Sequence, residues 1–270
     1  MIPLEDNFND VIGKAQRGLK ISDADLARAA GVSLVDLAST KDGKFDETVV
    51  KKLAPVLKLG ANALVAVGKK AWQPKDPGTI PGLAMFTTPY GDITVNSFLV
   101  WDPKSKAAVF FDTGAESSGM LKLAAENGLK AGLILLTHTH PDHIADLAKL
   151  ESASGAKAYV CELEAIDGAE PFKAGKKFAA GGLEIETRQT SGHSKGGITY
   201  VISGLQAPVA VVGDSIFASS MGGGIISYED ALRNNREKIL TLPGNTVLCP
   251  GHGPLTTVAE EKANNPFFTS

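Results

Sequence analysis

The stretch of sequence that decides the fold is Thr137-His138-Thr139-His140-Pro141-Asp142-His143, directly after the apolar run Gly132–Leu136. The apolar run predicts a strand, and Pro141-Asp142 predicts the start of a helix, so the histidines lie on a loop at a sheet edge. Residues two apart on an extended segment project to the same side, which lets His138 and His140 share one ion. Asp142 and His143 begin the next turn and point to a neighbouring position. The heptapeptide therefore predicts half of each of two adjacent metal sites.

The two remaining histidines of the chain stand in two later short motifs. His193 ends Thr190–His193, and His252 lies within Cys249–Pro254. Between them, Asp214 follows the apolar run Val209–Val212. Imidazole is the commonest metal ligand in proteins, and a carboxylate can bridge two cations. Because no histidine lies outside these motifs, the sequence predicts that all five serve one centre with two metal ions.

The composition predicts a folded, soluble protein. With 270 residues, 43% of them hydrophobic and 21% charged, the chain can build one large domain with a small companion. A formal net charge of −3 argues against a whole-molecule affinity for polyanions. The first residues lack the pattern of a signal peptide, and no apolar stretch is long enough to cross a membrane. Two cysteines, Cys161 and Cys249, make no disulfide framework and are expected to be buried. We expect a cytoplasmic protein.

Two zones of different pattern divide the chain. Residues 1–73 read as helices throughout, residues 74–82 hold three prolines and two glycines and read as a linker, and residues 83–270 mix strands with helices. The strands that the pattern predicts are Leu83–Thr87, Ile93–Trp101, Ala107–Phe111, Gly132–Leu136, Ala158–Val160, Leu183–Thr187, Ile198–Ile202, Val209–Val212 and Thr246–Leu248. The helices predicted among them are Ser117–Asn127, Ile144–Ala153, Glu162–Ala165 and Tyr228–Leu240. An early meander followed by strand–helix alternation predicts an α+β fold with two sheets packed face to face and helices outside.

The region from residue 83 onward resembles the metallo-β-lactamase superfamily, and within it the hydroxyacylglutathione hydrolase (glyoxalase II) branch. The motifs that carry the resemblance are Phe111–Gly114, the heptapeptide, Ser191–Ser194, Gly213–Phe217, Pro250–Pro254 and Asn264–Phe267. The resemblance implies an αββα sandwich, here preceded by a small all-α domain.

The resemblance also implies a ligand set and a reaction. The first metal would be held by His138, His140 and His193, the second by Asp142, His143 and His252, with Asp214 as the bridge. Zinc is the expected metal, with iron and manganese as alternatives suited to the same ligands. A hydroxide bridging the two ions would attack a thioester carbonyl, and Asp142 would hold or receive its proton. Asp112 would brace the metal loop by hydrogen bonds, or else cap the turn at Thr113-Gly114.

The substrate side of the site is less specified. Lys195 would reach an anionic substrate or remain solvated, and the loop Ser219–Gly224, with Ser220 and Met221, would border the substrate or form a turn without a partner. Long glyoxalase II enzymes have basic C-terminal helices that clamp glutathione, whereas only sixteen residues follow Pro254 here. We therefore expect a small-molecule thioester or ester substrate with weak selectivity for glutathione. A lactonase or β-lactamase-like hydrolase is the alternative, although Asp214 stands where common β-lactamases have a cysteine.

The N-terminal segment resembles a Cro/repressor-type helix-turn-helix over Ile21–Ser33 and on into Leu53–Leu59. The expected second helix, Ser33–Thr40, has an aspartate and no arginine or lysine to reach bases or phosphates. Residues 1–75 hold twelve basic and nine acidic side chains, a small excess. We therefore expect this domain to serve packing or homodimer formation. The alternative is a DNA-binding regulator whose metallo-domain senses a metabolite.

Overall fold

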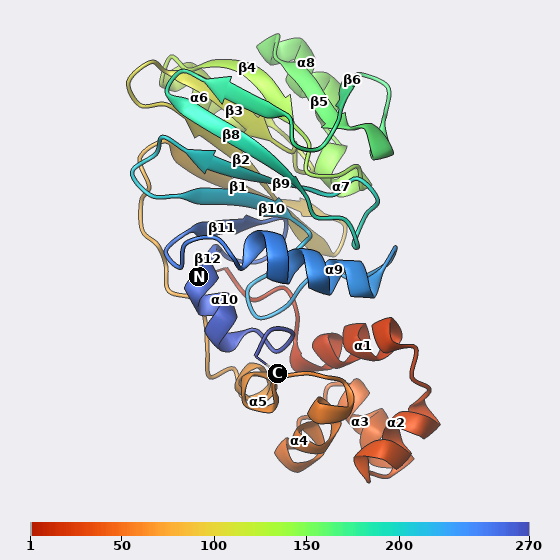
Figure 1. The fold of residues 1–270 in the computed structure, drawn as a ribbon. Coiled ribbons are helices and arrows are strands. Elements are labelled where there is room, and N and C mark those ends of the chain that lie inside the picture. The colour runs from red at the N-terminus through yellow and green to blue at the C-terminus, as the bar shows by residue number, and fades with distance from the viewer. Residues whose placement is uncertain (1, 270) are drawn as a thin grey trace.

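The structure, a computed structural model, describes residues 2–269. Two six-stranded sheets are stacked face to face with helices on their outer faces, and a separate layer of helices adjoins one end of this sandwich (Figure 1). The mixed α+β fold that the sequence predicts is confirmed.

The first sheet has the strand order β1-β2-β3-β4-β5-β6. Its first three strands form an antiparallel meander, and β3, β4, β5 and β6 run parallel to one another. The bounds are β1 Leu83–Tyr90, β2 Ile93–Trp101, β3 Ala107–Phe111, β4 Lys130–Leu135, β5 Lys157–Cys161 and β6 Ala169–Phe172. Parallel neighbours need crossovers. Helix α6 (Ser118–Glu126) lies in the crossover from β3 to β4, and helix α8 (Leu147–Ser154) lies in the crossover from β4 to β5.

The second sheet has the order β12-β11-β10-β9-β8-β7. All neighbouring pairs are antiparallel except β10 and β11, which are parallel. The bounds are β7 Lys177–Ala180, β8 Leu183–Gln189, β9 Ile198–Ser203, β10 Val209–Gly213, β11 Val247–Pro250 and β12 Thr256–Thr257. The chain between β10 and β11 contains α9 (Tyr228–Asn234) and the π-helical turn η2 (Asn235–Ile239).

The main core lies between the two sheets. It joins residues such as Phe111 of β3 with Tyr200 of β9 and Val211 of β10, all at most 1% exposed. A second core lies under α6 and α8 on the first sheet, and a third lies under η2 and α10 (Val258–Asn264) on the second. Both sheets are thus buried on two faces, which explains why their central strands read as continuous apolar runs.

Five helices precede the sandwich: α1 (Phe8–Leu19), α2 (Asp23–Ala30), α3 (Leu34–Lys41), α4 (Glu47–Val56) and α5 (Ala61–Gly68). Serines cap two of these helices: the hydroxyls of Ser22 and Ser33 accept hydrogen bonds from the backbone N–H groups of Asp25 and Asp36. Gly31 ends α2 in the left-handed conformation. Residues 71–80 form neither helix nor strand.

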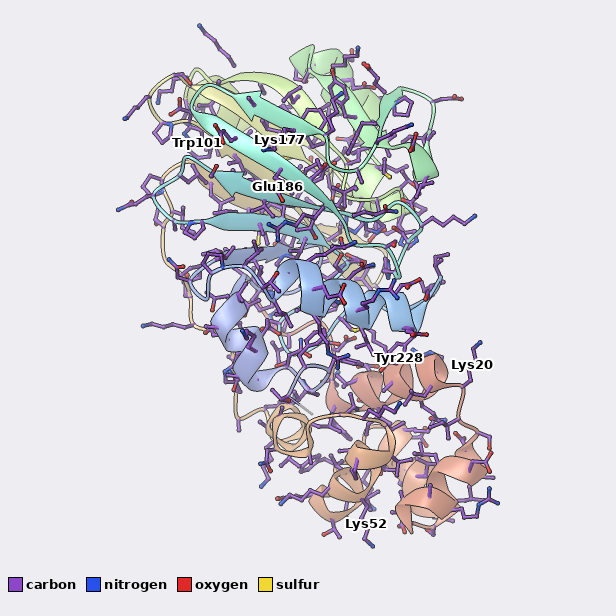
Figure 2. The ribbon with its side chains drawn as sticks, in the orientation of Figure 1. Lys20, Lys52, Trp101, Lys177, Glu186 and Tyr228 are labelled. Carbon is purple, nitrogen blue, oxygen red and sulfur yellow. The ribbon has the colours of Figure 1, made fainter. Side chains whose placement is uncertain are left out.

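The helical layer shares its core with the sandwich. The buried cluster of α1 to α5 continues into Met221, Ala231 and Phe267 of the later chain. Figure 2 shows Tyr228 at this boundary, where its ring packs so closely on Gly18 of α1 that an added Cβ would lie 2.2 Å from the ring. The N-terminal helices are therefore packed against the region that follows Asp214.

The structure differs from the sequence-based elements in several places. The sequence pattern does not predict the short strands β6, β7 and β12 or the helix α10, because these segments are too short to show a clear apolar periodicity. The N-terminal region that the sequence pattern reads as helical up to residue 73 has its last helix end at Gly68. The predicted helix Glu162–Ala165 contains only a 3-10 turn, η1 (Glu162–Glu164). Both cysteines are free and buried, as expected. No helix within residues 2–269 combines the length and apolar character that a membrane crossing requires.

Candidate metal centre

All five histidines and two aspartates meet at one edge of the sandwich, where strands of both sheets end. The heptapeptide follows β4 and leads into the short helix α7 (Pro141–Ile144), His193 follows β8, Asp214 follows β10, and His252 follows β11. The seven side chains form two adjacent groups of potential metal ligands, with donor atoms in each within 4.8 Å of one another. The structure thus brings together every residue that the sequence analysis placed in the centre.

The first group holds three imidazoles. His140 Nδ1 lies 3.1 Å from His138 Nε2 and 3.0 Å from His193 Nε2. Asp214 Oδ2 completes the group, at 3.3 Å from His193 Nε2 and 4.0 Å from His138 Nε2. Four donor atoms therefore face a common point.

The second group joins Asp142, His143 and His252. Asp142 Oδ2 lies 3.3 Å from His252 Nε2 and 3.7 Å from His143 Nε2. Asp214 faces this group as well, since its Oδ1 lies 3.3 Å from His143 Nε2 and its Oδ2 lies 3.4 Å from His252 Nε2. Asp214 is buried between the two groups, the position that a bridging carboxylate needs.

Backbone carbonyls fix the tautomers of two imidazoles. His252 Nδ1 lies 2.6 Å from the Thr94 carbonyl, and His193 Nδ1 lies 3.0 Å from the Gly223 carbonyl. A carbonyl oxygen only accepts, so in both rings Nδ1–H is the donor. Nε2 of each neutral ring therefore presents a lone pair to the centre, as a metal ligand must.

Asp112 orients the metal loop through three contacts. Its carboxylate accepts hydrogen bonds from the Thr137 N–H and hydroxyl, each at 2.7 Å, and from His143 Nδ1–H at 2.8 Å. The Thr137 oxygen in turn lies 3.0 Å from His138 Nδ1, which donates to it. One carboxylate thus orients an imidazole of each group, contacts expected of a brace rather than of a cap for the turn at Thr113-Gly114.

The donor set fits two cations. His143 Nε2 and Asp214 Oδ1 are buried with no hydrogen-bond partner among the described residues, and buried polar atoms without partners are rare. In a tetrahedral site with metal–nitrogen bonds near 2 Å, neighbouring donors lie about 3.4 Å apart. The donor separations of 3.0–4.0 Å fall around this value. Bound cations would give the lone pairs of His143 Nε2 and Asp214 Oδ1 a partner.

The pKa values of the candidate ligands are shifted by burial and by one another's charges. Burial disfavours the ionised form of Asp214, but His143 and His252 outweigh it and hold the pKa of this carboxylate well below its ordinary value. Burial also disfavours protonated His143, yet Asp214 and Asp112 raise its pKa to about 10. For His138, burial and the neighbouring imidazoles lower the pKa well below its ordinary value. The buried Asp214 carboxylate therefore requires positive charge beside it, from a protonated imidazole such as His143 or from bound cations.

Close packing behind the centre allows only glycine at position 251. An added Cβ on Gly251 would lie 2.2 Å from Asp214 Oδ1 and 2.6 Å from His143 Cε1. The loop is held from β2, where Asn96 Nδ2 donates to the carbonyls of Pro250 and Gly253 at 3.0 and 2.8 Å. His252 is therefore placed by a buried amide that the sequence analysis did not identify.

Two acidic residues near the centre were also missed. The Glu164 carboxylate accepts the N–H groups of Thr139 at 3.1 Å and Gly196 at 2.9 Å, and so ties together the loops that carry His140 and His193. Glu5, from the N-terminal segment, lies close to His252. Burial raises the pKa of the Glu5 carboxyl group, and the charge of His252 opposes this shift. Neither has a local sequence pattern, because both reach the centre through tertiary folding.

The three predicted substrate contacts, Lys195, Ser220 and Met221, differ in their exposure to solvent. Lys195 is exposed on the loop after His193. Met221 is fully buried in the core shared with the helical layer, and the Ser220 hydroxyl donates to Asp6. Ser220 and Met221 therefore pack against the helical layer and do not border open space. Ser219 is also fixed, since its N–H donates to Glu261 at 3.0 Å, so this loop is not a turn without a partner.

Known proteins share both the sequence pattern and the fold. A probable metallo-hydrolase of Bacillus subtilis, YqgX, is 31% identical over 207 residues, which cover 67% of this chain and 95% of the relative. The hydroxyacylglutathione hydrolase GloC of Haemophilus influenzae is 27% identical over 200 residues, 65% of this chain and 93% of that protein. The crystal structure of the BLEG-1 B3 metallo-beta-lactamase superposes with a TM-score of 0.61 and 27% identity, covering 69% of this chain and all of the other.

The family model of the metallo-beta-lactamase superfamily matches residues 90–252, a range that contains all seven residues of the two groups and excludes the five N-terminal helices. With this match and with the two-sheet fold, the chain belongs to the metallo-beta-lactamase superfamily.

Proposed function

We propose that the protein is a hydrolase with two divalent metal ions whose substrates are thioesters. The observation that carries the proposal is the pair of adjacent donor groups that share Asp214. In this proposal His138, His140 and His193 hold one ion and Asp142, His143 and His252 hold the other. Zinc is the expected metal on the ligand chemistry, and iron or manganese would fit the same donors.

The residues of the chain have separate tasks in the reaction. Divalent ions in such a centre lower the pKa of water and polarise a carbonyl group. Asp142 is buried, and its hydrogen bond with His252 and the charge on His143 outweigh burial and lower the pKa of its carboxyl group. Asp142 is therefore ionised at neutral pH and can accept a proton at a carboxylate oxygen. Asp112 holds Thr137 and His143 in place from behind.

A thioester suits the site better than an amide. A thiolate is a stable anion that leaves without prior protonation, so no dedicated general acid is required. The likeness to a hydroxyacylglutathione hydrolase over 65% of the chain supports the same reaction class. The likeness to a B3 metallo-beta-lactamase supports a cyclic amide as the competing substrate.

Turnover of three substrate classes tests the proposal. S-lactoylglutathione, a lactone and a β-lactam are compared with metal-replete protein, and free thiol is measured for the first. We expect thioester hydrolysis that a chelator abolishes and that added metal restores. Hydrolysis of the lactone or the β-lactam without thioester turnover would refute the reaction assignment.

For the helical layer we propose packing rather than DNA reading. The helix in the recognition position, α3, exposes Leu34 and Val35, at 57% and 75%, and next to them Asp36. Apolar and acidic side chains neither pair with phosphates nor read base edges. A gel shift on genomic fragments at low salt tests this, and salt-sensitive retardation would contradict it.

A further inference from the structure

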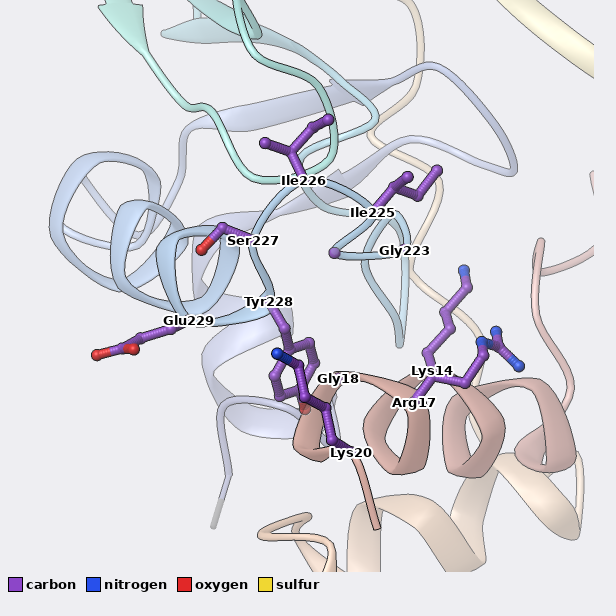
Figure 3. A pocket seen from close by; sticks show the side chains of 11 residues that line it. Lys14, Arg17, Gly18, Lys20, Gly223, Ile225, Ile226, Ser227, Tyr228 and Glu229 are labelled. Carbon is purple, nitrogen blue, oxygen red and sulfur yellow. The ribbon is translucent and has the colours of Figure 1, made fainter. Parts of the chain in front are cut away.

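A cavity of about 760 Å³ opens between helix α1 and the segment that leads into α9. Its lining is formed on one side by Lys14, Arg17, Gly18 and Lys20, and on the other by residues 223–229. Figure 3 shows the side chain of Lys14 rising from α1 toward the loop at Gly223, whereas the side chain of Arg17 extends along α1. A volume of this size is typical of a small-molecule site.

The cavity is basic, and two of its cations are free. Lys14 is paired with Asp6 and donates to the Met221 carbonyl, so its charge is already used. Arg17 and Lys20 are exposed and form no ion pair with any described carboxylate. The acidic side chain of the lining, Glu229, points away from Arg17 and Lys14 in Figure 3. Two unpaired cations therefore face one cavity.

The cavity lies behind a candidate ligand of the metal centre. Its wall residue Gly223 accepts a hydrogen bond, at 3.0 Å, from Nδ1 of His193, the ring nitrogen that faces away from the centre. Lys14 Nζ lies 5.1 Å from the Phe217 ring centre, and that ring packs edge-to-face on His252 at 5.6 Å. The cavity wall thus contacts one candidate ligand, His193, through Gly223, and reaches a second, His252, through Lys14 and the Phe217 ring.

The wall also offers apolar contact. Ile225 and Ile226 are 71% and 53% exposed, and both line the cavity, together with the half-buried ring of Tyr228. Exposed branched aliphatic side chains beside cations suit a ligand with an apolar stem and an anionic end.

We propose that Arg17 of helix α1 and Lys20, which follows the end of this helix, form a subsite for the anionic part of the thiol that leaves the thioester. The subsite rests on the proposed function and adds the class of thiol: one that bears carboxylates or phosphates. Helix α1 lies before residue 90, outside the range that matches the superfamily, so this chain would supply the charge from its own N-terminal layer.

Three thioesters with one acyl group test the subsite: one of glutathione, one of coenzyme A and one of uncharged N-acetylcysteamine. The double variant Arg17→Glu/Lys20→Glu should raise KM for the anionic thioester that the wild type prefers by about tenfold relative to KM for the uncharged one. The change should appear in KM rather than kcat, because the contact is made equally in the ground and transition states. The conservative variant Arg17→Lys, which keeps the positive charge, should have a KM for the anionic thioester close to that of the wild type. Lys52→Glu is the matched control, an exposed lysine on the far side of the helical layer (Figure 2).

The preferred thioester identifies the source of the anion, carboxylate or phosphate. An equal rise in KM for all three thioesters, or none, would overturn the subsite while leaving hydrolysis intact. If no thioester is hydrolysed, calorimetry with the non-hydrolysable S-methylglutathione and with coenzyme A decides separately. Binding by the wild type that the double variant loses supports the subsite, and equal binding or no binding by either protein refutes it.

Discussion

The ammonium group of Lys14 in helix α1 donates a hydrogen bond to the backbone carbonyl of Met221, 2.9 Å away and 207 positions later in the chain. This contact fixes the loop after Asp214 to the helical layer. Asp6 reinforces it, since its carboxylate pairs with Lys14 and accepts the Ser220 hydroxyl. The N-terminal segment is therefore part of the surroundings of the metal centre, although every candidate metal ligand lies in the sandwich.

The Lys14–Asp6 pair should stabilise this attachment. Both side chains are mostly buried, at 14% and 10% exposure, so Lys14→Met leaves a carboxylate without its cation and should lower the free energy of unfolding by about 2 kcal/mol. The double variant Lys14→Met/Asp6→Asn should recover part of the loss. Urea unfolding of the four proteins measures the coupling, and strictly additive effects would show that the pair contributes nothing.

Asp112→Ala should weaken both metal positions, because this one carboxylate orients His143 directly and His138 through Thr137. We expect metal affinity to fall about 10- to 100-fold. Competition with a chromophoric chelator measures it. Asp102→Asn, which alters a buried aspartate in the turn between β2 and β3, is the control. Equal affinities for the Asp112 variant and the wild type would reject the bracing role.

Gly251→Ala should disturb the centre through contact alone. The new methyl group would lie 2.2 Å from Asp214 Oδ1, so the carboxylate or the loop must move. Metal affinity should fall at least tenfold. Gly132→Ala, where no heavy atom lies within 4 Å of the new Cβ, should leave the affinity unchanged. Retention of wild-type affinity by the Gly251 variant would mean that this loop adapts freely.

The candidate centre could be predicted because its pattern is local. His138, His140, Asp142 and His143 stand within six residues, and the loop between a strand and a helix leaves them few arrangements. The later ligands His193 and Asp214 each follow an apolar or alternating run, which predicts a strand end. Such positions meet at one edge when the strands join one sandwich.

The surroundings could not be predicted because their contacts join distant segments. Glu5, Glu164 and Asn96 resemble ordinary polar residues in the sequence, and only folding places them beside the centre. Likewise, the sequence left open whether the loop with Met221 borders the substrate or forms a turn without a partner, and in the structure Met221 packs in the core of the N-terminal helices. Short strands such as β7, with four residues, give too little periodicity to identify.

Glu261 should make stability depend on pH. It is fully buried, and burial raises the pKa of its carboxyl group from 4.5 to about 7 despite hydrogen bonds from Thr256, Asn265 and Ser219. The folded state thus binds the proton more tightly than the unfolded state. The resulting stabilisation is full below pH 4.5 and is lost as the pH rises through 7, by roughly 3 kcal/mol in total.

Glu261→Gln removes this titration and serves as the comparison. Free energies of unfolding from urea titrations between pH 4.5 and 8 should fall more steeply for the wild type than for the variant. Parallel curves for the two proteins would show that Glu261 does not titrate in this range.

The central claim, two metal ions bridged by Asp214, is tested most directly by the metal content of the protein. Elemental analysis after metal loading and desalting should give about two equivalents per chain for the wild type, because the ligands form two groups. His252→Ala should retain about one equivalent, since it alters the second group alone, and Asp214→Ala should retain less than one, since Asp214 faces both. One equivalent in the wild type, or two in Asp214→Ala, would contradict the account.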